Sequence, residues 1–144
     1  MSQGIALEGM RLVKENLTVV YDDPTNLTGR AHMMSAAMMG ATAFQKGLGA
    51  IHALSHPIGA IYHTHHGTTN AVVMQAVMRF NRSEIEDRFV SAARYLDIEG
   101  GFDGFYEFVG GLVTHLNIPK NLTDLGLRDL GNADFDRIVA AALN

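Results

Sequence analysis

The sequence predicts an all-α fold, a bundle of about six or seven helices in a single domain that covers residues 1–144. Apolar residues recur at spacings of three and four along most of the chain, which is typical of helices that bury one face. No run shows the apolar and polar alternation of a strand bounded by turns. The sequence also shows no internal repeat and no low-complexity linker. These observations together favour helices packed on helices.

Two helices are predicted before residue 47. Apolar residues from Ala6 to Val20 lie on one helical face, and this helix should end before Pro24, because the residue ahead of a proline disfavours the helical conformation. The segment 27–46 is rich in alanine and methionine and apolar on most sides, which indicates a helix buried in the centre of a bundle. Its methionines are interpreted as adaptable core residues rather than metal ligands: Met33, Met34, Met38 and Met39.

A third helix is predicted over residues 49–62 and a fourth over residues 68–81, with a turn at 63–67 between them. Pro57 lies inside the third helix, where its missing backbone donor should kink the helix or mark its start. The fourth helix is apolar along one side, as a helix packed against a core would be.

The last three helices are predicted from capping and breaking residues. Ser83 with Glu86 has the pattern of a capping box, which indicates a helix start. A glycine pair separates this fifth helix from a sixth, which Pro119 ends. Asn132 is expected to cap a final helix that reaches Leu143.

Composition and charge argue against several classes of protein. The net charge of -4 leaves no basic surface for nucleic acid, and no run of lysine and arginine suggests a membrane surface. The absence of cysteine excludes disulfides and thiolate metal sites. Residues 1–17 lack the basic start and apolar run of a signal peptide, and no apolar stretch reaches the roughly 18 residues that span a bilayer. We therefore predict a cytoplasmic protein without nucleic-acid or membrane partners.

The chemistry of the sequence is concentrated between residues 48 and 70, which hold five of the seven histidines: His52, His56, His63, His65 and His66. His52 and His56 are four residues apart and share one face of a helix. That spacing is compatible with a divalent metal bound by two imidazoles. Two hydrogen-bonded interior histidines are the alternative, because neither an H-E-x-x-H motif nor a nearby carboxylate accompanies them.

The other three histidines of this stretch stand within four residues beside Gly67, and their density at a turn indicates a site. Imidazoles together with a carboxylate suit Fe(II), Zn(II) and similar ions, which polarise an alcohol or carbonyl oxygen. No acidic residue lies between Asp23 and Glu84, so a carboxylate ligand must come from elsewhere in the fold or from another chain. Two isolated histidines are interpreted as ordinary helix residues: His32 and His115.

The stretch GLGAIHALSHPIGAIYHTHHGTTNAVVM, residues 47–74, closely resembles the metal-site segment of the iron-containing (group III) alcohol dehydrogenases. The shared pattern is an H-x-x-x-H-P pair, a glycine and aromatic stretch, and then H-G followed by an Asn-Ala helix. Residues 29–46 look like the preceding helix of that family, and NIPKNLTDLGL resembles its I-P-x-x-L-x-D-L-G turn. The resemblance covers essentially the whole chain and implies the C-terminal helical domain of such an enzyme.

The resemblance also implies a role for each histidine. His52 and His66 match two metal ligands, whereas His56 matches a catalytic histidine close to the nicotinamide and the substrate. This division replaces the joint chelation by His52 and His56 that spacing alone suggests. His63 and His65 fall at variable positions near the pocket, and His65 stands where many members have proline. The implied cofactors are Fe(II), with Zn(II) or another divalent metal as alternatives, and NAD(P), which would bind only with a cofactor domain.

The sequence departs from the family pattern in what it lacks. Family members are more than twice as long, with an N-terminal Rossmann-like cofactor domain and a D-x-x-x-H helix that supplies two further metal ligands. No D-x-x-x-H occurs here. We therefore expect the metal-site domain of an NAD(P)-linked, iron-dependent alcohol dehydrogenase, incomplete and inactive alone, that acts on a small alcohol or aldehyde. Its partner would be a cofactor-domain chain, or it would form a homo-oligomer.

A second interpretation belongs to a different class. The chain would then be a non-catalytic helical remnant or interaction module that retains the metal-binding histidines. A neighbouring reading frame that encodes a glycine-rich βαβ unit and a D-x-x-x-H motif would favour the enzyme.

Overall fold

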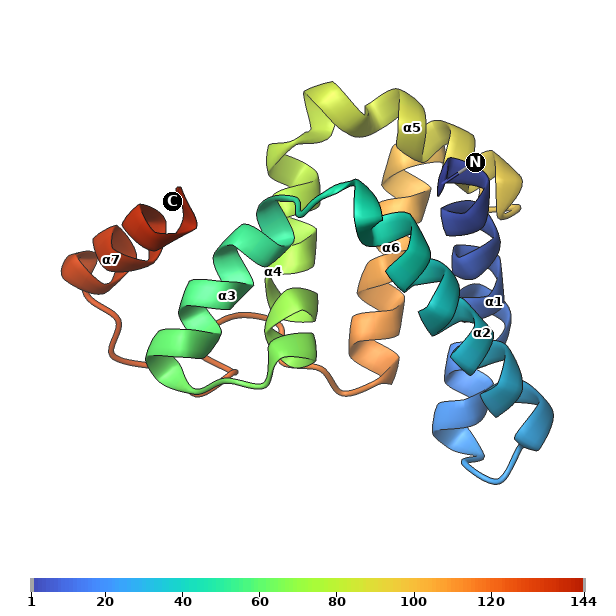
Figure 1. Cartoon of the computed structure of the whole chain (residues 1–144), viewed down its shortest axis with the longest axis horizontal. Coiled ribbons are helices and arrows are strands. Elements are labelled where there is room, and N and C mark those ends of the chain that lie inside the picture. The colour runs from blue at the N-terminus through green and yellow to red at the C-terminus, as the bar shows by residue number, and fades with distance from the viewer. Residues whose placement is uncertain (1, 144) are drawn as a thin grey trace. The chain divides into compact units, whose positions relative to one another are not determined.

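The computed structural model describes residues 2–143 (Figure 1). Within that range the regular secondary structure is all helical, with no strand. The predicted all-α class is therefore confirmed. Seven α-helices and one short 3-10 helix follow in chain order: α1 Ser2–Asp22, α2 Leu27–Ala43, η1 Phe44–Lys46, α3 Ala50–Tyr62, α4 His66–Phe80, α5 Arg82–Tyr95, α6 Gly101–His115 and α7 Asn132–Ala142.

The helices form two compact units. The first consists of Met1–Gly47 and Glu86–Phe108, and the second consists of Leu48–Ile85 and Val109–Asn144. The five clustered histidines all belong to the second unit. The prediction of a single domain stays a prediction.

In the first unit α1 packs along α2 and is joined by polar contacts to the last residue of α5 and to the residue that follows it. Tyr95 donates a hydrogen bond to Glu8 Oε2 at 3.0 Å, and Lys14 Nζ donates to the carbonyl of Leu96 at 2.5 Å. Arg11 binds both carboxylate oxygens of Glu8 at 2.6 and 2.9 Å. The hydrogen bond from Arg11, and to a smaller extent that from Tyr95, lowers the pKa of Glu8 to about 2.

The prediction that residues 27–46 form a helix buried on most sides is wrong. Met34 and Met38 are 76% and 65% exposed, and the buried residues of α2 are Gly29 and Ala36. An apolar helix is buried only where other elements cover each of its sides, and the main neighbour of α2 is α1. The interpretation of Met34 and Met38 as core residues is therefore corrected.

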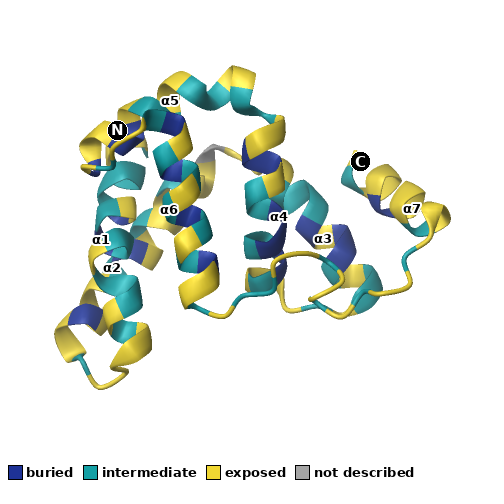
Figure 2. Ribbon diagram, turned by 180° about the vertical axis from the view of Figure 1, so that it is seen from behind, coloured by how far each residue is buried: buried dark blue, intermediate teal, exposed yellow. Residues whose placement is uncertain are grey.

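The second unit is organised around α3 and α4, which pack side by side and carry buried positions toward the core (Figure 2). Ile58 from α3, Val73 from α4 and Ile138 from α7 form its buried apolar centre. Tyr62 at the end of α3 donates a hydrogen bond to Asp134 Oδ1 at 2.9 Å, which attaches α7 to α3. This core fixes the two helices that carry the histidines.

Helix starts differ from the predictions by one or two residues. Ser83 is the second residue of α5 rather than the cap before it, so the predicted capping box is wrong. The residue before α7 is Gly131 rather than Asn132, and its N–H donates to Asp134 Oδ2 at 2.9 Å. Among the described helices, none is both long enough and apolar enough to cross a membrane. The cytoplasmic location stays a prediction.

Candidate histidine site

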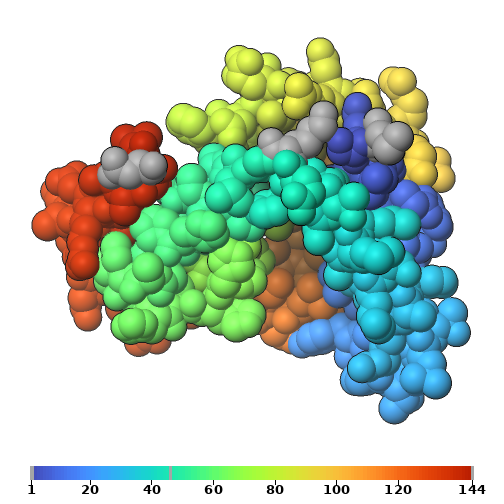
Figure 3. Space-filling model, in the orientation of Figure 1, coloured from blue at the N-terminus to red at the C-terminus, as the bar shows by residue number. Residues whose placement is uncertain are grey.

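Three imidazoles meet where α3 and α4 lie together. The ring centres of His52 and His56 on α3 are 5.6 Å apart, as expected for residues one helical turn apart. His66 is the first residue of α4, and its ring centre lies 5.3 Å from each of the other two. His52 is partly buried, whereas His56 and His66 are exposed. Both helices also contribute to the surface on the face seen in Figure 3.

The close approach of His66 depends on the three residues between the two helices. His63 ends α3 in the left-handed conformation, with φ at 56°, and its N–H donates to the carbonyl of Gly59 at 2.9 Å. A residue in this conformation reverses the chain directly after a helix. Thr69, which is fully buried, donates its hydroxyl to the carbonyl of His65 at 2.9 Å and so fixes the start of α4.

His65 caps α4. Its Nδ1 accepts a hydrogen bond from the backbone N–H of Thr68 at 3.3 Å, which satisfies a donor in the first helical turn. The sequence left the role of this histidine open, and the structure gives it a local structural one.

Replacing His65 by alanine should lower the free energy of unfolding by about 1 kcal/mol, because a first-turn N–H loses its partner. His65→Asn, which restores a capping oxygen, should recover most of that loss. His63→Asn is the matched control, because asparagine tolerates the left-handed conformation and the His63 side chain is exposed. Urea unfolding followed by circular dichroism measures all three variants. A His65→Ala protein as stable as the parent would contradict the capping role.

Sequence reasoning missed two polar residues of the site, Asn70 and Ser55. Asn70 Nδ2 lies 3.0 Å from His66 Nε2 and 3.3 Å from His52 Nε2. Asn70 Oδ1 lies 2.5 Å from the hydroxyl of Ser55, a residue with no exposed surface. The signal for Asn70 was its position four residues after His66, since residues so spaced share a helical face.

The surroundings of His52 favour its neutral form. Burial lowers the pKa of His52, and the neighbouring His66 and His56 lower it further. A neutral imidazole keeps the lone pair that binds a metal ion. His52 is therefore suited to act as a ligand.

The donor set fits two ligands of a metal site. The Nε2 atoms of His52 and His66 share Asn70 Nδ2 as a neighbour, so the two atoms converge on one small region. Imidazole nitrogen is a good ligand for Fe(II) and Zn(II). Within residues 2–143, however, no group of three or more histidine, cysteine, aspartate or glutamate side chains is arranged to hold a metal ion. The remaining ligands of such an ion would have to come from outside this set.

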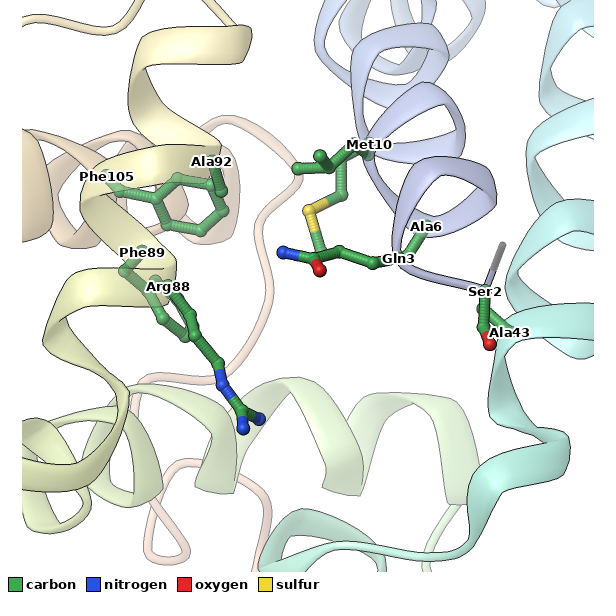
Figure 4. Close-up of a pocket in the computed structure, with 10 residues that line it drawn as sticks. Ser2, Gln3, Ala6, Met10, Ala43, Arg88, Phe89, Ala92 and Phe105 are labelled. Carbon is green, nitrogen blue, oxygen red and sulfur yellow. The ribbon is translucent and has the colours of Figure 1, made fainter.

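A separate cavity of about 450 Å³ lies in the first unit and contains no histidine. Met10 of α1 and Phe89 of α5 border it, and the side chain of Gln3 extends into the space between them (Figure 4). Its remaining lining residues are mostly apolar, and Arg88 is the charged exception. The predicted histidine site is therefore distinct from this cavity.

The fold and the site define an all-helical domain in which histidines from two adjacent helices converge. The sequence model described as "Fe-containing alcohol dehydrogenase family, C-terminal" matches residues 1–144, and the chain belongs to this family. The resemblance seen in the sequence is thereby confirmed. The family is named for its iron.

Two dehydrogenases that are related in sequence show the extent of the similarity. The chain is 37% identical over 151 residues to 4-hydroxybutyrate dehydrogenase of Cupriavidus necator, a match that covers 99% of this chain and 38% of the relative. The 1,3-propanediol dehydrogenase of Citrobacter freundii is 28% identical, with the same coverage.

Among solved structures, 1,3-propanediol oxidoreductase matches with a TM-score of 0.90 and 28% identity, over 99% of this chain and 38% of that one. Sulfoacetaldehyde reductase from Bifidobacterium kashiwanohense, solved in complex with NAD+, has the same fold with a TM-score of 0.88 at 21% identity. The chain therefore spans about 38% of the length of these relatives.

Proposed function

We propose that this chain supplies the histidine part of the active site of an NAD(P)-linked, iron-dependent alcohol dehydrogenase. The observation that carries the proposal is the convergence of His52 Nε2 and His66 Nε2 on one neighbouring atom, in a chain of this family. The substrate would be a small alcohol or aldehyde. The names of the relatives, which include dehydrogenases for 4-hydroxybutyrate and 1,3-propanediol, support this substrate class.

The proposed roles are those that the resemblance to the family implies for the three imidazoles. His52 and His66 would bind Fe(II), or Zn(II) in its place, through Nε2. When bound, the ion supplies Lewis acidity toward an alcohol or carbonyl oxygen, and the nicotinamide supplies the hydride acceptor. The ring centre of His56 lies 5.6 Å from that of His52 and 5.3 Å from that of His66, and the resemblance assigns this neighbouring histidine to the substrate and the nicotinamide rather than to the ion.

The proposal includes a partner that binds NAD(P) and completes the ligand set. The sequence contains no G-x-G-x-x-G turn to cradle a pyrophosphate, and no D-x-x-x-H. A cofactor-domain chain would supply both, and a homo-oligomer is the other arrangement that we consider. The exposed apolar side chains of α2, among them Leu27, Met34 and Met38, support an association of this kind.

The alternative, a helical interaction module that retains the histidines, predicts association without catalysis. Reconstitution separates the two proposals. The 144-residue chain is mixed with, or fused to, a cofactor domain of the family that carries the glycine-rich turn and the Asp and His ligands. With Fe(II) under anaerobic conditions and a small alcohol, the complex should form NAD(P)H, whereas either part alone should not, because hydride transfer needs all groups within reacting distance.

Steady NAD(P)H formation by the 144-residue chain alone would contradict the proposed need for a partner. Association with the cofactor domain but no activity with any small alcohol would favour the interaction module.

A further inference from the structure

The orientation of the Asn70 amide is set from one side by Ser55. Ser55 lies on α3 with no exposed surface, and its hydroxyl donates to Asn70 Oδ1 at 2.5 Å. A buried hydroxyl keeps such a partner because an unpaired polar group in the interior is costly. With the oxygen end of the amide engaged by Ser55, the nitrogen end faces the two imidazoles.

The amide nitrogen of Asn70 has two N–H bonds and two acceptors. It donates to His66 Nε2 at 3.0 Å and to His52 Nε2 at 3.3 Å. A neutral imidazole accepts a hydrogen bond only at its unprotonated nitrogen, so the proton of each ring lies on Nδ1. The pairing with Asn70 therefore selects, in both rings, the tautomer that leaves Nε2 able to bind a metal.

The same amide also determines where the two rings lie. Asn70 follows His66 by one turn of α4, and it reaches across to His52 on α3. One group thus fixes the position of an imidazole on each helix. Rings that are already held together lose less freedom when a metal ion binds, and such preorganisation raises the affinity for the ion.

We propose that Asn70, oriented by Ser55, is a positioning residue that aligns His52 and His66 for metal binding. This inference rests on the proposed function, because it concerns the same two ligands. Each Nε2 has a single lone pair, so a bound ion replaces Asn70 as its partner. The contribution of Asn70 is made before that replacement, because it brings both rings to one place in one tautomer. Of the two hydrogen bonds that the ion must displace, the one to His52 is long at 3.3 Å and hence weak, and the one to His66 has an ordinary length of 3.0 Å.

The tautomers provide the direct test. The metal-free chain is labelled with ¹⁵N-histidine, and long-range ¹H–¹⁵N correlations identify the protonated nitrogen of each ring. We expect Nδ1–H at His52 and His66 in the parent. Asn70→Asp has the same shape but presents an acceptor, so it should move the proton to Nε2 in both rings and leave His32, which pairs with Asn16, unchanged. Nε2–H in the parent, or unchanged tautomers in Asn70→Asp, would overturn the proposal.

Zinc titration followed by calorimetry gives the second readout, with thermal unfolding to show that each variant is folded. Asn70→Ala and Ser55→Ala should each lower zinc affinity, by up to about tenfold, because the two rings are no longer held in place before the ion binds. Ser91→Ala, which removes a hydroxyl on α5, is the control and should have no effect. Unchanged zinc affinity in both variants would overturn the positioning role. A parent chain that binds no zinc at His52 and His66 would instead contradict the proposed function, and the tautomers would still test the role of Asn70.

Discussion

Gly104→Ala should destabilise the first unit by about 3 kcal/mol or more, at the upper end of the cost of overpacking. A Cβ added at Gly104 would lie 1.7 Å from the carbonyl oxygen of Glu99 and 2.8 Å from its carbonyl carbon. Both atoms belong to the backbone, so a side-chain movement does not relieve the contact. The turn is already fixed by Gly100 and Gly101, whose φ angles of 86° and 60° are costly for other residues.

The same helix offers a matched control for this substitution. Gly111 also lies inside α6, is exposed, and has open space around an added Cβ. Gly111→Ala should therefore raise the free energy of unfolding by up to about 1 kcal/mol, through helix propensity alone. Urea unfolding compares the two variants with the parent. A Gly104→Ala protein as stable as the Gly111→Ala protein would contradict the close packing of the turn against α6.

His52→Ala or His66→Ala should abolish turnover in the reconstituted enzyme through loss of metal. Each substitution removes one of two proposed ligands. Loss of a hydrogen-bond partner of a ligand costs up to about 100-fold in metal affinity, so loss of the ligand itself should cost about 100-fold or more. His56→Ala is the internal control, because its ring is a close neighbour of both but is assigned to the substrate side. It should lower turnover and leave the metal content close to that of the parent.

Metal analysis after dialysis and initial rates of NAD(P)H formation measure these two effects separately. Equal loss of metal in all three variants would contradict the separate role of His56. Metal retention in both His52→Ala and His66→Ala would contradict the ligand assignment itself.

The sequence predicted the helices more accurately than their surroundings. The stretch from α3 to α4 was placed to within two residues, because glycines, Pro57 and the apolar spacing mark its helices locally. The exposure of Met34 and Met38 was not predictable, since an apolar helix surface does not reveal which other element covers it. Ser83 failed as a cap because capping patterns also occur inside helices.

For the site, spacing alone suggested a pair of histidines on one helix. His52 and His56 are one turn apart on α3, but Asn70 links His52 with His66. Asn70 is eighteen residues from His52 in the chain and four residues from His66. That link depends on how α3 packs against α4, which no local pattern contains. The resemblance to the family pairs His52 with His66 as ligands, an assignment that stays a prediction. It did not identify Asn70 and Ser55 as partners of these rings.

The central claim is that His52 and His66 together bind the metal ion. Anomalous scattering from crystals of the 144-residue chain soaked in Zn(II) tests it most directly. The account predicts one strong peak at about 2.0–2.1 Å from Nε2 of both His52 and His66. A peak bound to His56 with only one of these residues, or placed at His63 or His65 instead, would contradict it.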